Sequence, residues 1–304
     1  MKRSRLIAYV ALILNALIWG LAIPIVKLGF NAGLSPTSFL FARFALATFF
    51  SLPIFFFLLK KGSLKNQLTL KNIAIITAHE LLGTFAALWL LYEGVARTSA
   101  VASSLIAVTW PIFVVLGGIF ILKEREEKHE WAGLILAITG TLILILSPLL
   151  HNGFKVEGST SGNLLILSQN LAIAAYYLLA KKFYKNLNKW LVTHISFWVG
   201  TISFGAVLLF RNNNSLLLIP QSLAEIGWPL IAILYMSILG SIVGLTLYLI
   251  GQNKIEASEA SLFTYTQPIF ALPLAIFLLG ETVSPIQIIA SLLILVGVFI
   301  AEKR

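Results

Sequence analysis

The sequence contains no cysteine, so it offers neither disulfide bonds nor thiolate ligands for a metal ion. It also contains no aspartate, because each of its 12 acidic residues is a glutamate. That absence disfavours membrane enzymes that hold magnesium and pyrophosphate with clustered aspartates. Charge is scarce as well: 11% of the 304 residues are charged, whereas a soluble globular protein is about a quarter charged. Water is therefore the wrong solvent to assume for most of this chain.

Hydrophobic residues make up 59% of the chain and fall in long blocks. A block of about 20 residues crosses a hydrocarbon core of about 30 Å as an α-helix. We therefore expect an all-α membrane protein, and we interpret the first block as a helix because it is too long for a signal peptide. Ten transmembrane helices are expected at residues 6–30, 36–59, 72–96, 99–122, 130–150, 162–182, 190–210, 228–251, 258–279 and 285–301.

Basic residues between the blocks predict the orientation. Ten spans place both termini on one side of the membrane. The basic residues on that side are Lys2, Arg3, Arg5, Lys60, Lys61, Lys65, Lys71, Lys123, Arg125, Lys128, Lys181, Lys182, Lys185, Lys189, Lys254, Lys303 and Arg304. The other side has Arg97, Lys155 and Arg211. The positive-inside rule then predicts cytoplasmic N and C termini in a bacterial inner membrane. The net charge of +10 is interpreted as this topology signal, so no nucleic-acid partner is expected.

The chain contains an internal repeat. Residues 88–143 align without a gap with residues 245–300, so that Glu124 meets Glu281. The other matched residues include Gly94 with Gly251, Thr109 with Thr266, Pro111 with Pro268 and Gly140 with Gly297. The first spans of the two halves match more loosely, Asn15 with Asn170 and Lys27 with Lys182. We expect two five-helix units, residues 1–150 and 151–304.

An odd number of helices per unit forces the two units into opposite orientations. Inverted repeats are frequent in secondary transporters, whose substrate site lies near the bilayer midplane between the repeats. Exchanging the conformations of two similar halves converts an inward-open cavity into an outward-open one, which is alternating access. The alternative is a duplicated scaffold without transport.

Several stretches resemble the EamA family of the drug/metabolite transporter superfamily. They are Trp19-Gly20 with Pro24 and Lys27, Arg43-Phe44 with Ala47, and the repeated Thr-x-Pro…Glu segments that end in Gly140 and Gly297. The resemblance implies ten helices in two EamA repeats, a pocket between helices one, three, four, six, eight and nine, and transport of amino acids, nucleosides, sugars or drugs. Glu93 departs from the small residue that the family usually has there.

Ionisable residues inside the spans need separate explanations, because a central charge costs roughly 3 kcal/mol or more. Lys27 and Arg43 lie near the external ends of their spans, where they either snorkel and pair structurally or bind an anionic substrate group. His79 and Glu80 are candidates for proton coupling, and the alternative for Glu80 is an ion pair with Lys71 or Lys65. Glu93 precedes Arg97 by four residues, the helical spacing of a structural ion pair.

Neutral polar and aromatic residues are further candidates for the pocket. Asn15 and Trp19 share a face of the first helix, as do Asn170 and Tyr177 on the sixth. The remaining candidates surround the two repeated prolines: Thr109, Trp110, Thr264, Tyr265 and Gln267. Such residues often form interhelical hydrogen bonds or pack between helices instead of binding a substrate. Small residues at Gly133, Ala137, Gly140, Ala290 and Gly297 predict close helix packing within the monomer or in a weak homodimer.

These observations predict a secondary transporter that moves a small amphipathic metabolite, first of all an amino acid, in the direction of export. The sequence has no nucleotide-binding loop for a pump and no metal-ligand spacing. We expect no catalytic residues, no metal and no cofactor, and as partners a small-molecule substrate and the lipid bilayer. The alternative is an intramembrane enzyme or translocase that acts on a lipid-linked substrate.

Overall fold

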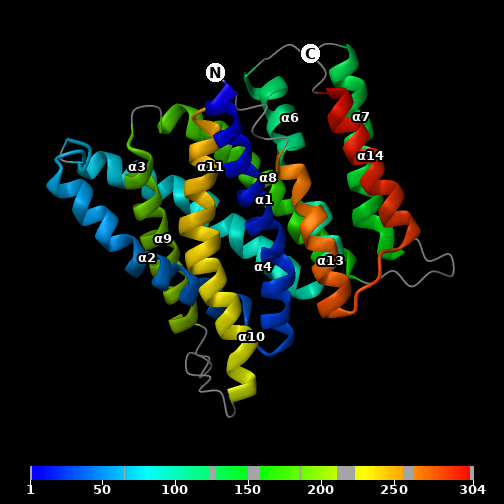
Figure 1. The fold of residues 1–304 in the computed structure, drawn as a ribbon, viewed down its shortest axis with the longest axis horizontal. Helices are drawn as coiled ribbons and strands as arrows, with labels where there is room; N and C mark the ends of the chain where they lie inside the picture. The colour runs from blue at the N-terminus through cyan, green and yellow to red at the C-terminus, as the bar shows by residue number, and fades with distance from the viewer. Residues whose placement is uncertain are drawn as a thin grey trace.

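The computed structural model describes residues 2–64, 66–122, 128–149, 158–184, 187–210, 223–255 and 263–301. Every regular element in these ranges is a helix, so the expected all-α class is confirmed. Both chain termini lie at the same end of the bundle, shown at the top of Figure 1. We call this the terminal end, and the other the opposite end.

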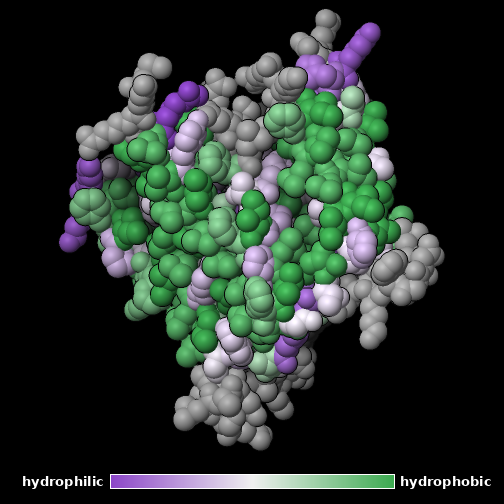
Figure 2. All heavy atoms as spheres, turned by 45° about the vertical axis from the view of Figure 1, so that its right-hand side comes forward, coloured by the Kyte–Doolittle hydropathy of each residue, from purple (hydrophilic) through white to green (hydrophobic). Residues whose placement is uncertain are grey.

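Eight helices are long and apolar enough to cross a membrane. They are Arg5–Asn31, Pro36–Lys60, Leu70–Arg97, Ala100–Ile121, Lys128–Leu149, Thr160–Ala180, Lys189–Phe210 and Gly227–Gln252. Two shorter apolar helices, Phe263–Leu279 and Pro285–Ala301, fall in the ninth and tenth expected ranges. Hydrophobic residues cover the middle of the molecular face in Figure 2, and the most hydrophilic residues lie around its margins, at the top, the left edge and the lower end. The chain is a multi-pass membrane protein, while the count of ten spans stays a prediction. We number the ten segments as spans 1 to 10.

The first half consists of spans 1 to 5. Its elements are α1 (Lys2–Asn31), α2 (Pro36–Lys60), α3 (Leu70–Glu80), the π-helix η1 (Leu81–Ala87), α4 (Leu88–Arg97), α5 (Ala100–Ala107), α6 (Trp110–Leu122), α7 (Lys128–Leu146) and the 3₁₀ turn η2 (Ser147–Leu149). Three of these helices start where a hydroxyl side chain, on Ser35, Thr69 or Ser99, accepts a hydrogen bond from a backbone N–H in the first turn. Such caps satisfy donors that have no partner inside the helix.

The second half consists of spans 6 to 10. Its elements are α8 (Thr160–Phe183), α9 (Lys189–Phe210), α10 (Leu223–Leu234), the π-helix η4 (Tyr235–Gly244), α11 (Leu245–Gln252), the 3₁₀ turn η5 (Phe263–Thr266), α13 (Gln267–Leu279) and α14 (Pro285–Ala301). Residues 258–262 of the expected ninth span, which include Ser261, lie outside the described residues.

Spans 3 and 8 each contain a π-helical segment in the same place. Residues 81–87 of η1, shifted by the 157 residues that separate Gly94 from Gly251, fall on residues 238–244 of η4. A π-helical segment contains i→i+5 hydrogen bonds, which leaves backbone groups free for other partners. The structural similarity of the two halves therefore begins before residue 88, where the sequence alignment begins.

The two halves pack reciprocally. Span 1 packs on spans 8 and 9 of the second half, and span 6 packs on spans 3 and 4 of the first half. This gives two groups, spans 1, 8 and 9 and spans 3, 4 and 6. The pairs α2 with α9 and α7 with α14 flank them, and each pair also joins the two halves. The contacts between α7 and α14 explain the small residues, because a Cβ on Gly133 or Gly297 would collide with the backbone of the other helix.

Candidate functional site

Two candidate residues of span 1 bind the π-helix of span 8. The Asn15 Nδ2 atom donates to the Gly244 carbonyl at 2.9 Å, and the Trp19 Nε1 atom donates to the Gly240 carbonyl at 3.0 Å. The indole of Trp19 also lies 5.6 Å from the ring of Tyr248. In this conformation, a substrate would have to displace these two carbonyls to reach the donors of Asn15 and Trp19.

Asn170 of span 6, which the repeat matches with Asn15, binds the broken helix of span 4. The Asn170 Nδ2 atom donates to the Ile106 carbonyl at 2.8 Å and to Thr109 Oγ1 at 2.9 Å. The interruption between α5 and α6 precedes Pro111, whose nitrogen lacks the hydrogen that a continuous helix requires. Asn15 and Asn170 thus each donate to a carbonyl at an irregular stretch of the other half, in span 8 for Asn15 and in span 4 for Asn170.

The remaining neutral candidates lie in spans 4 and 6 and at the start of span 9. Trp110 stacks on Tyr177, with ring centroids 4.7 Å apart. Thr264 and Tyr265 are buried in η5, and Gln267 begins α13. A Cβ on Gly20 would lie 2.5 Å from the carbonyl oxygen of Gln267, so the backbones of α1 and α13 approach closely here. Trp110 and Tyr177 lie in one group of spans, while Tyr265 and Gln267 lie in the other.

Arg43 is a buried cation between spans 2, 3 and 8, with 9% of its surface exposed. Its Nε atom donates to Ser241 Oγ at 3.2 Å, and its Nη1 atom donates to Tyr92 Oη at 3.0 Å. The guanidinium also lies over the rings of Phe44 and Tyr92. A guanidinium has five N–H donors, so these two bonds leave three that have no partner among the described residues. Within the described ranges no carboxylate pairs with it.

Lys27 binds the end of span 3, at the opposite end of the bundle. Its Nζ atom donates to the carbonyls of Val95, Ala96 and Thr98 at 2.9, 3.0 and 2.8 Å. These contacts use all three of its N–H donors. A cation is favourable at a helix C-terminus, because the unpaired carbonyls there carry partial negative charge.

Glu281 binds the adjacent start of span 4. Its two carboxylate oxygens accept the backbone N–H groups of Ala100 and Val101 at 2.7 and 2.8 Å. Sequence reasoning assigned no functional role to Glu281, although the repeat paired it with Glu124, which lies outside the described residues. Lys27 and Glu281 both come from the group of spans 1, 8 and 9. Together they tie that group to spans 3 and 4 at the opposite end.

Glu80 is 1% exposed and is held by hydroxyl groups. The hydroxyls of Tyr176 and Tyr184 each lie 2.8 Å from its Oε1 atom, and Thr84 Oγ1 lies 2.5 Å from its Oε2 atom. Thr84 in turn lies 2.7 Å from Ser196 Oγ of α9. Among the described residues, hydroxyl groups and not a lysine hold Glu80, so the expected alternative of a pair with Lys71 is not seen. Lys65 lies outside the described residues.

His79 joins the same cluster from the neighbouring position of α3. Its Nδ1 atom lies 2.7 Å from the Tyr184 hydroxyl, and its Nε2 atom lies 3.1 Å from the Tyr176 carbonyl oxygen. Its ring stacks on the ring of Tyr176 at 4.3 Å. Burial, reinforced by the neighbouring Glu80, raises the pKa of Tyr184, so this hydroxyl keeps its proton. Tyr176 and Tyr184, to which the sequence assigned no role in the site, thus link His79 and Glu80, and their part in proton coupling stays a prediction.

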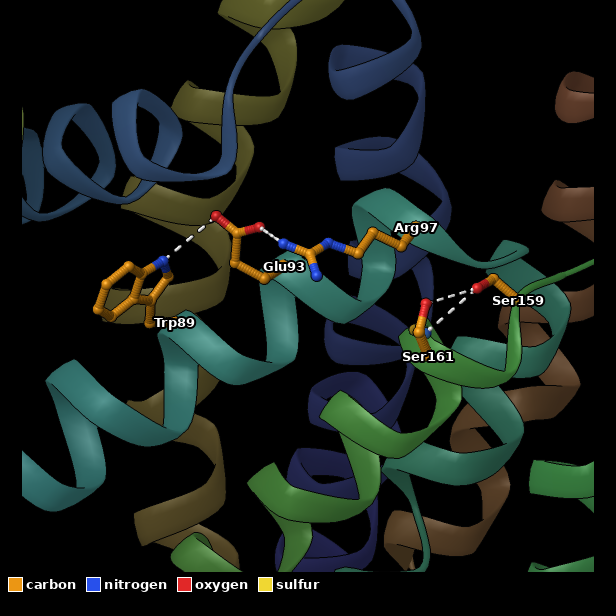
Figure 3. Close-up of polar contacts among 6 residues, drawn as sticks. Trp89, Glu93, Arg97, Ser159 and Ser161 are labelled. Carbon is orange, nitrogen blue, oxygen red and sulfur yellow. Dashed lines mark hydrogen bonds and ion pairs between the residues drawn. The ribbon is translucent and has the colours of Figure 1, made fainter. Parts of the chain in front are cut away.

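The expected pair between Glu93 and Arg97 is present. Their side chains are 2.9 Å apart, and the other carboxylate oxygen of Glu93 accepts from Trp89 Nε1 at 3.2 Å (Figure 3). Figure 3 also shows Ser159 and Ser161 hydrogen bonded at the start of α8. Because Glu93 binds partners one turn away on its own helix, it is a structural residue of the opposite end.

A groove of about 480 Å³ lies on the surface formed by α2, α3 and α9. Its lining is mostly apolar and includes Phe55, Leu81, His194 and Ile202. Leu81 and Ile202 are exposed on the outer surface of the bundle, so the groove faces the lipid rather than the contacts between the two groups of spans.

Comparisons with known proteins agree with this architecture. The model of the EamA-like transporter family matches residues 6–146 and 160–302. The chain is 28% identical to the "Uncharacterized transporter YyaM" of Bacillus subtilis (strain 168), over 88% of this chain and 85% of that protein. It is also 28% identical to a "Probable amino-acid metabolite efflux pump" of Salmonella typhimurium, over 98% of this chain and 95% of that protein. A solved structure described as "Crystal structure of protein" has a TM-score of 0.58 at 16% identity and covers 99% of this chain and 97% of that one, which shows the fold alone.

Proposed function

Because the chain belongs to the EamA-like transporter family, we propose that it is a secondary carrier that exports a small amphipathic metabolite by alternating access. The reciprocal packing of the two halves supports this mechanism, since two groups of spans that meet in a bilayer can rock against each other. The carrier acts as a monomer or weak homodimer and needs no cofactor.

The distribution of basic residues supports an orientation with both termini in the cytoplasm of a bacterium. The terminal end is then cytoplasmic, and the opposite end, with Lys27 and Glu281, is external. Their contacts tie the two groups of spans together on the external side, as in a carrier that is closed to the outside.

Arg43 is the observation that carries the proposal for the substrate. A buried cation is costly when, as among the described residues, no anion pairs with it. The donors left on its two Nη atoms can form a fork that fits a carboxylate. The aromatic and hydroxyl groups around it suit an amphipathic molecule with one acidic group. We therefore propose an amino acid or a related carboxylate as the substrate, in line with the name of the Salmonella relative.

His79 and Glu80 would couple this transport to protons. The buried carboxyl group of Glu80 connects through the Tyr184 hydroxyl to His79, and histidine exchanges protons near neutral pH. A proton bound here in one conformation and released in the other would drive export.

A second candidate function rests on the groove between α2, α3 and α9. Its mostly apolar lining on the lipid-facing surface suits an acyl or prenyl chain. A translocase for a lipid-linked substrate would use this groove, and export of a lipid-linked sugar that depends on this protein would distinguish it from the carrier.

The test is transport in proteoliposomes. A panel of labelled amino acids, their decarboxylated amines and nucleosides is assayed with and without a pH gradient. We expect transport of the carboxylates, and an increase in KM of about 10-fold or more in Arg43→Lys, which keeps the charge but loses the fork. Arg97→Lys is the matched control at the same end, and its KM should stay unchanged. If Arg43→Lys and Arg97→Lys each transported the amino acids and their decarboxylated amines equally well, the proposed substrate would be wrong.

A further inference from the structure

The hydrogen bonds of His79 determine where its protons lie. The Nε2 atom lies 3.1 Å from the carbonyl oxygen of Tyr176. A carbonyl oxygen accepts hydrogen bonds and never donates, so Nε2 must carry the hydrogen. Whether His79 is neutral or positively charged then depends on its other nitrogen alone.

That other nitrogen belongs to a chain of two hydrogen bonds. His79 Nδ1 lies 2.7 Å from the Tyr184 hydroxyl, and this hydroxyl lies 2.8 Å from Glu80 Oε1. Two hydrogen bonds in a row require two protons, and Tyr184 supplies one. The second proton lies on Nδ1, which makes His79 an imidazolium, or on Glu80, which makes it a carboxylic acid.

We infer that the chain His79–Tyr184–Glu80 holds one dissociable proton and that Tyr184 relays it. In the relay step, the Nδ1–H bond breaks as that proton bonds to the Tyr184 oxygen. The former Tyr184 proton bonds to Glu80 Oε1. The imidazolium and carboxylate become a neutral imidazole and a carboxylic acid, so protons and charge balance without another reactant.

The surroundings of this chain define the path by which the proton would enter. Tyr184 is partly exposed at the terminal end, whereas Glu80 is buried. From Glu80, the chain of hydrogen bonds continues through Thr84 to Ser196. The described titratable groups that face Glu80 are His79, Tyr176, Tyr177 and Tyr184, and α9 adds the neutral hydroxyl of Ser196. Tyr184 therefore connects the aqueous end to the buried carboxyl group. The stored proton follows from the contacts, while its use in transport rests on the proposed carrier function.

The protein contains a matched control in His194. Its ring stacks on Phe55 at 4.1 Å, much as His79 stacks on Tyr176 at 4.3 Å. Trp198 Nε1 donates to its Nε2 atom, so that nitrogen has no hydrogen. Its Nδ1 atom then donates to Ser51 Oγ. His194 is therefore a neutral histidine that holds no dissociable proton.

The test observes the proton without any transport assay. The full chain is labelled with ¹⁵N-histidine and held in nanodiscs between about pH 5 and 8, the range where histidine chemistry is informative. Nitrogen NMR reports the histidine protons, and the infrared carboxylic C=O band reports protonated Glu80. At the acidic end, we expect either two N–H signals for His79 or a carboxylic band that disappears in Glu80→Gln. His194 should show one N–H throughout.

Variants separate the relay from a structural role. Tyr184→Phe should uncouple the two groups, so that the His79 signal and the carboxylic band change at pH values at least one unit apart instead of together. His194→Phe should leave both signals unchanged. A neutral His79 beside an ionised Glu80 across the whole range would overturn the inference, as would joint titration in Tyr184→Phe. Because neither readout needs a substrate, a failure to find transport leaves this result standing.

Discussion

Lys27 donates a hydrogen bond of 2.8 Å to the carbonyl oxygen of Thr98, the residue at which span 3 gives way to span 4. On the other side of this junction, Glu281 accepts from the N–H groups that begin α5. A positive charge thus holds a helix C-terminus, and a negative charge holds the next helix N-terminus, which is the favourable sign at both. An anionic substrate reaches Lys27 in this conformation only if these bonds break.

Replacing Lys27 by Met should destabilise the protein. The change removes three charge-assisted hydrogen bonds from carbonyls in a part-buried place, and one bond to a charged group contributes about 1.5–3 kcal/mol. We expect a clear fall in the midpoint of thermal unfolding in detergent. Lys27→Arg keeps the charge and should lose less. An unchanged midpoint in Lys27→Met would show that water replaces the ammonium group at no cost.

Replacing Glu281 by Gln should open the opposite end. The amide keeps one acceptor oxygen but loses the charge that favours the helix N-terminus. Because the chain has no cysteine, Ile23→Cys, one turn deeper than Lys27, can report access to a membrane-impermeant maleimide added on that side. We expect labelling to increase several-fold in Glu281→Gln.

Two controls define that labelling result. Glu93 lies at the same end, but its carboxylate bonds within its own helix. Glu93→Gln should therefore leave the labelling of Ile23→Cys low. Ala32→Cys lies on the exposed loop after α1 and should be labelled in every background. Equal labelling in the Glu281 and Glu93 variants would mean that Glu281 does not hold this end closed.

The helical class followed from composition and block length, because a bilayer leaves so few alternatives for the backbone. The π-helices did not follow, since no residue type in Leu81–Ala87 demands an i→i+5 bond. One of them, η4, supplies the carbonyls that Asn15 and Trp19 bind. Glu80 was singled out because a charged residue within a span is costly. Its tyrosine partners could not be predicted, because they come from the segment that begins with α8 at Thr160, 80 residues later.

Trp19→Phe distinguishes packing from substrate binding. Phenylalanine keeps an aromatic ring beside Tyr248 and loses the hydrogen bond to Gly240. A single neutral hydrogen bond contributes about 1 kcal/mol, so we expect a small loss of thermal stability and a KM within about threefold of the parent. A much larger rise in KM with unchanged stability would return Trp19 to the substrate pocket.

Gly83→Ala should disturb the Glu80 cluster through Tyr176. A Cβ on Gly83 would collide with the ring of Tyr176, and overpacking of this kind costs about 1–3 kcal/mol. Gly227→Ala is the matched control, because no described atom lies within 4 Å of a Cβ at that helical glycine. We expect a lower unfolding midpoint for Gly83→Ala and an equal or higher one for the control. Equal midpoints would show that Tyr176 moves aside freely.

Tyr184→Phe and Tyr176→Phe should both weaken the contacts that hold Glu80, but they should affect proton-driven transport differently. Each tyrosine donates to Glu80 Oε1 at 2.8 Å, and donors to a carboxylate favour its charged form. One hydrogen bond to a charged group contributes about 1.5–3 kcal/mol, so each variant should lower the midpoint of thermal unfolding.

The rates should then separate the two tyrosines. Only Tyr184 also contacts His79 Nδ1, so only its loss interrupts the path from the terminal end to Glu80. Gradient-driven transport should fall relative to substrate exchange in Tyr184→Phe and keep its ratio in Tyr176→Phe. If both variants lowered that ratio equally, the two hydroxyls would serve Glu80 as donors alone, and the proton would reach the carboxyl group by a path that does not pass through Tyr184.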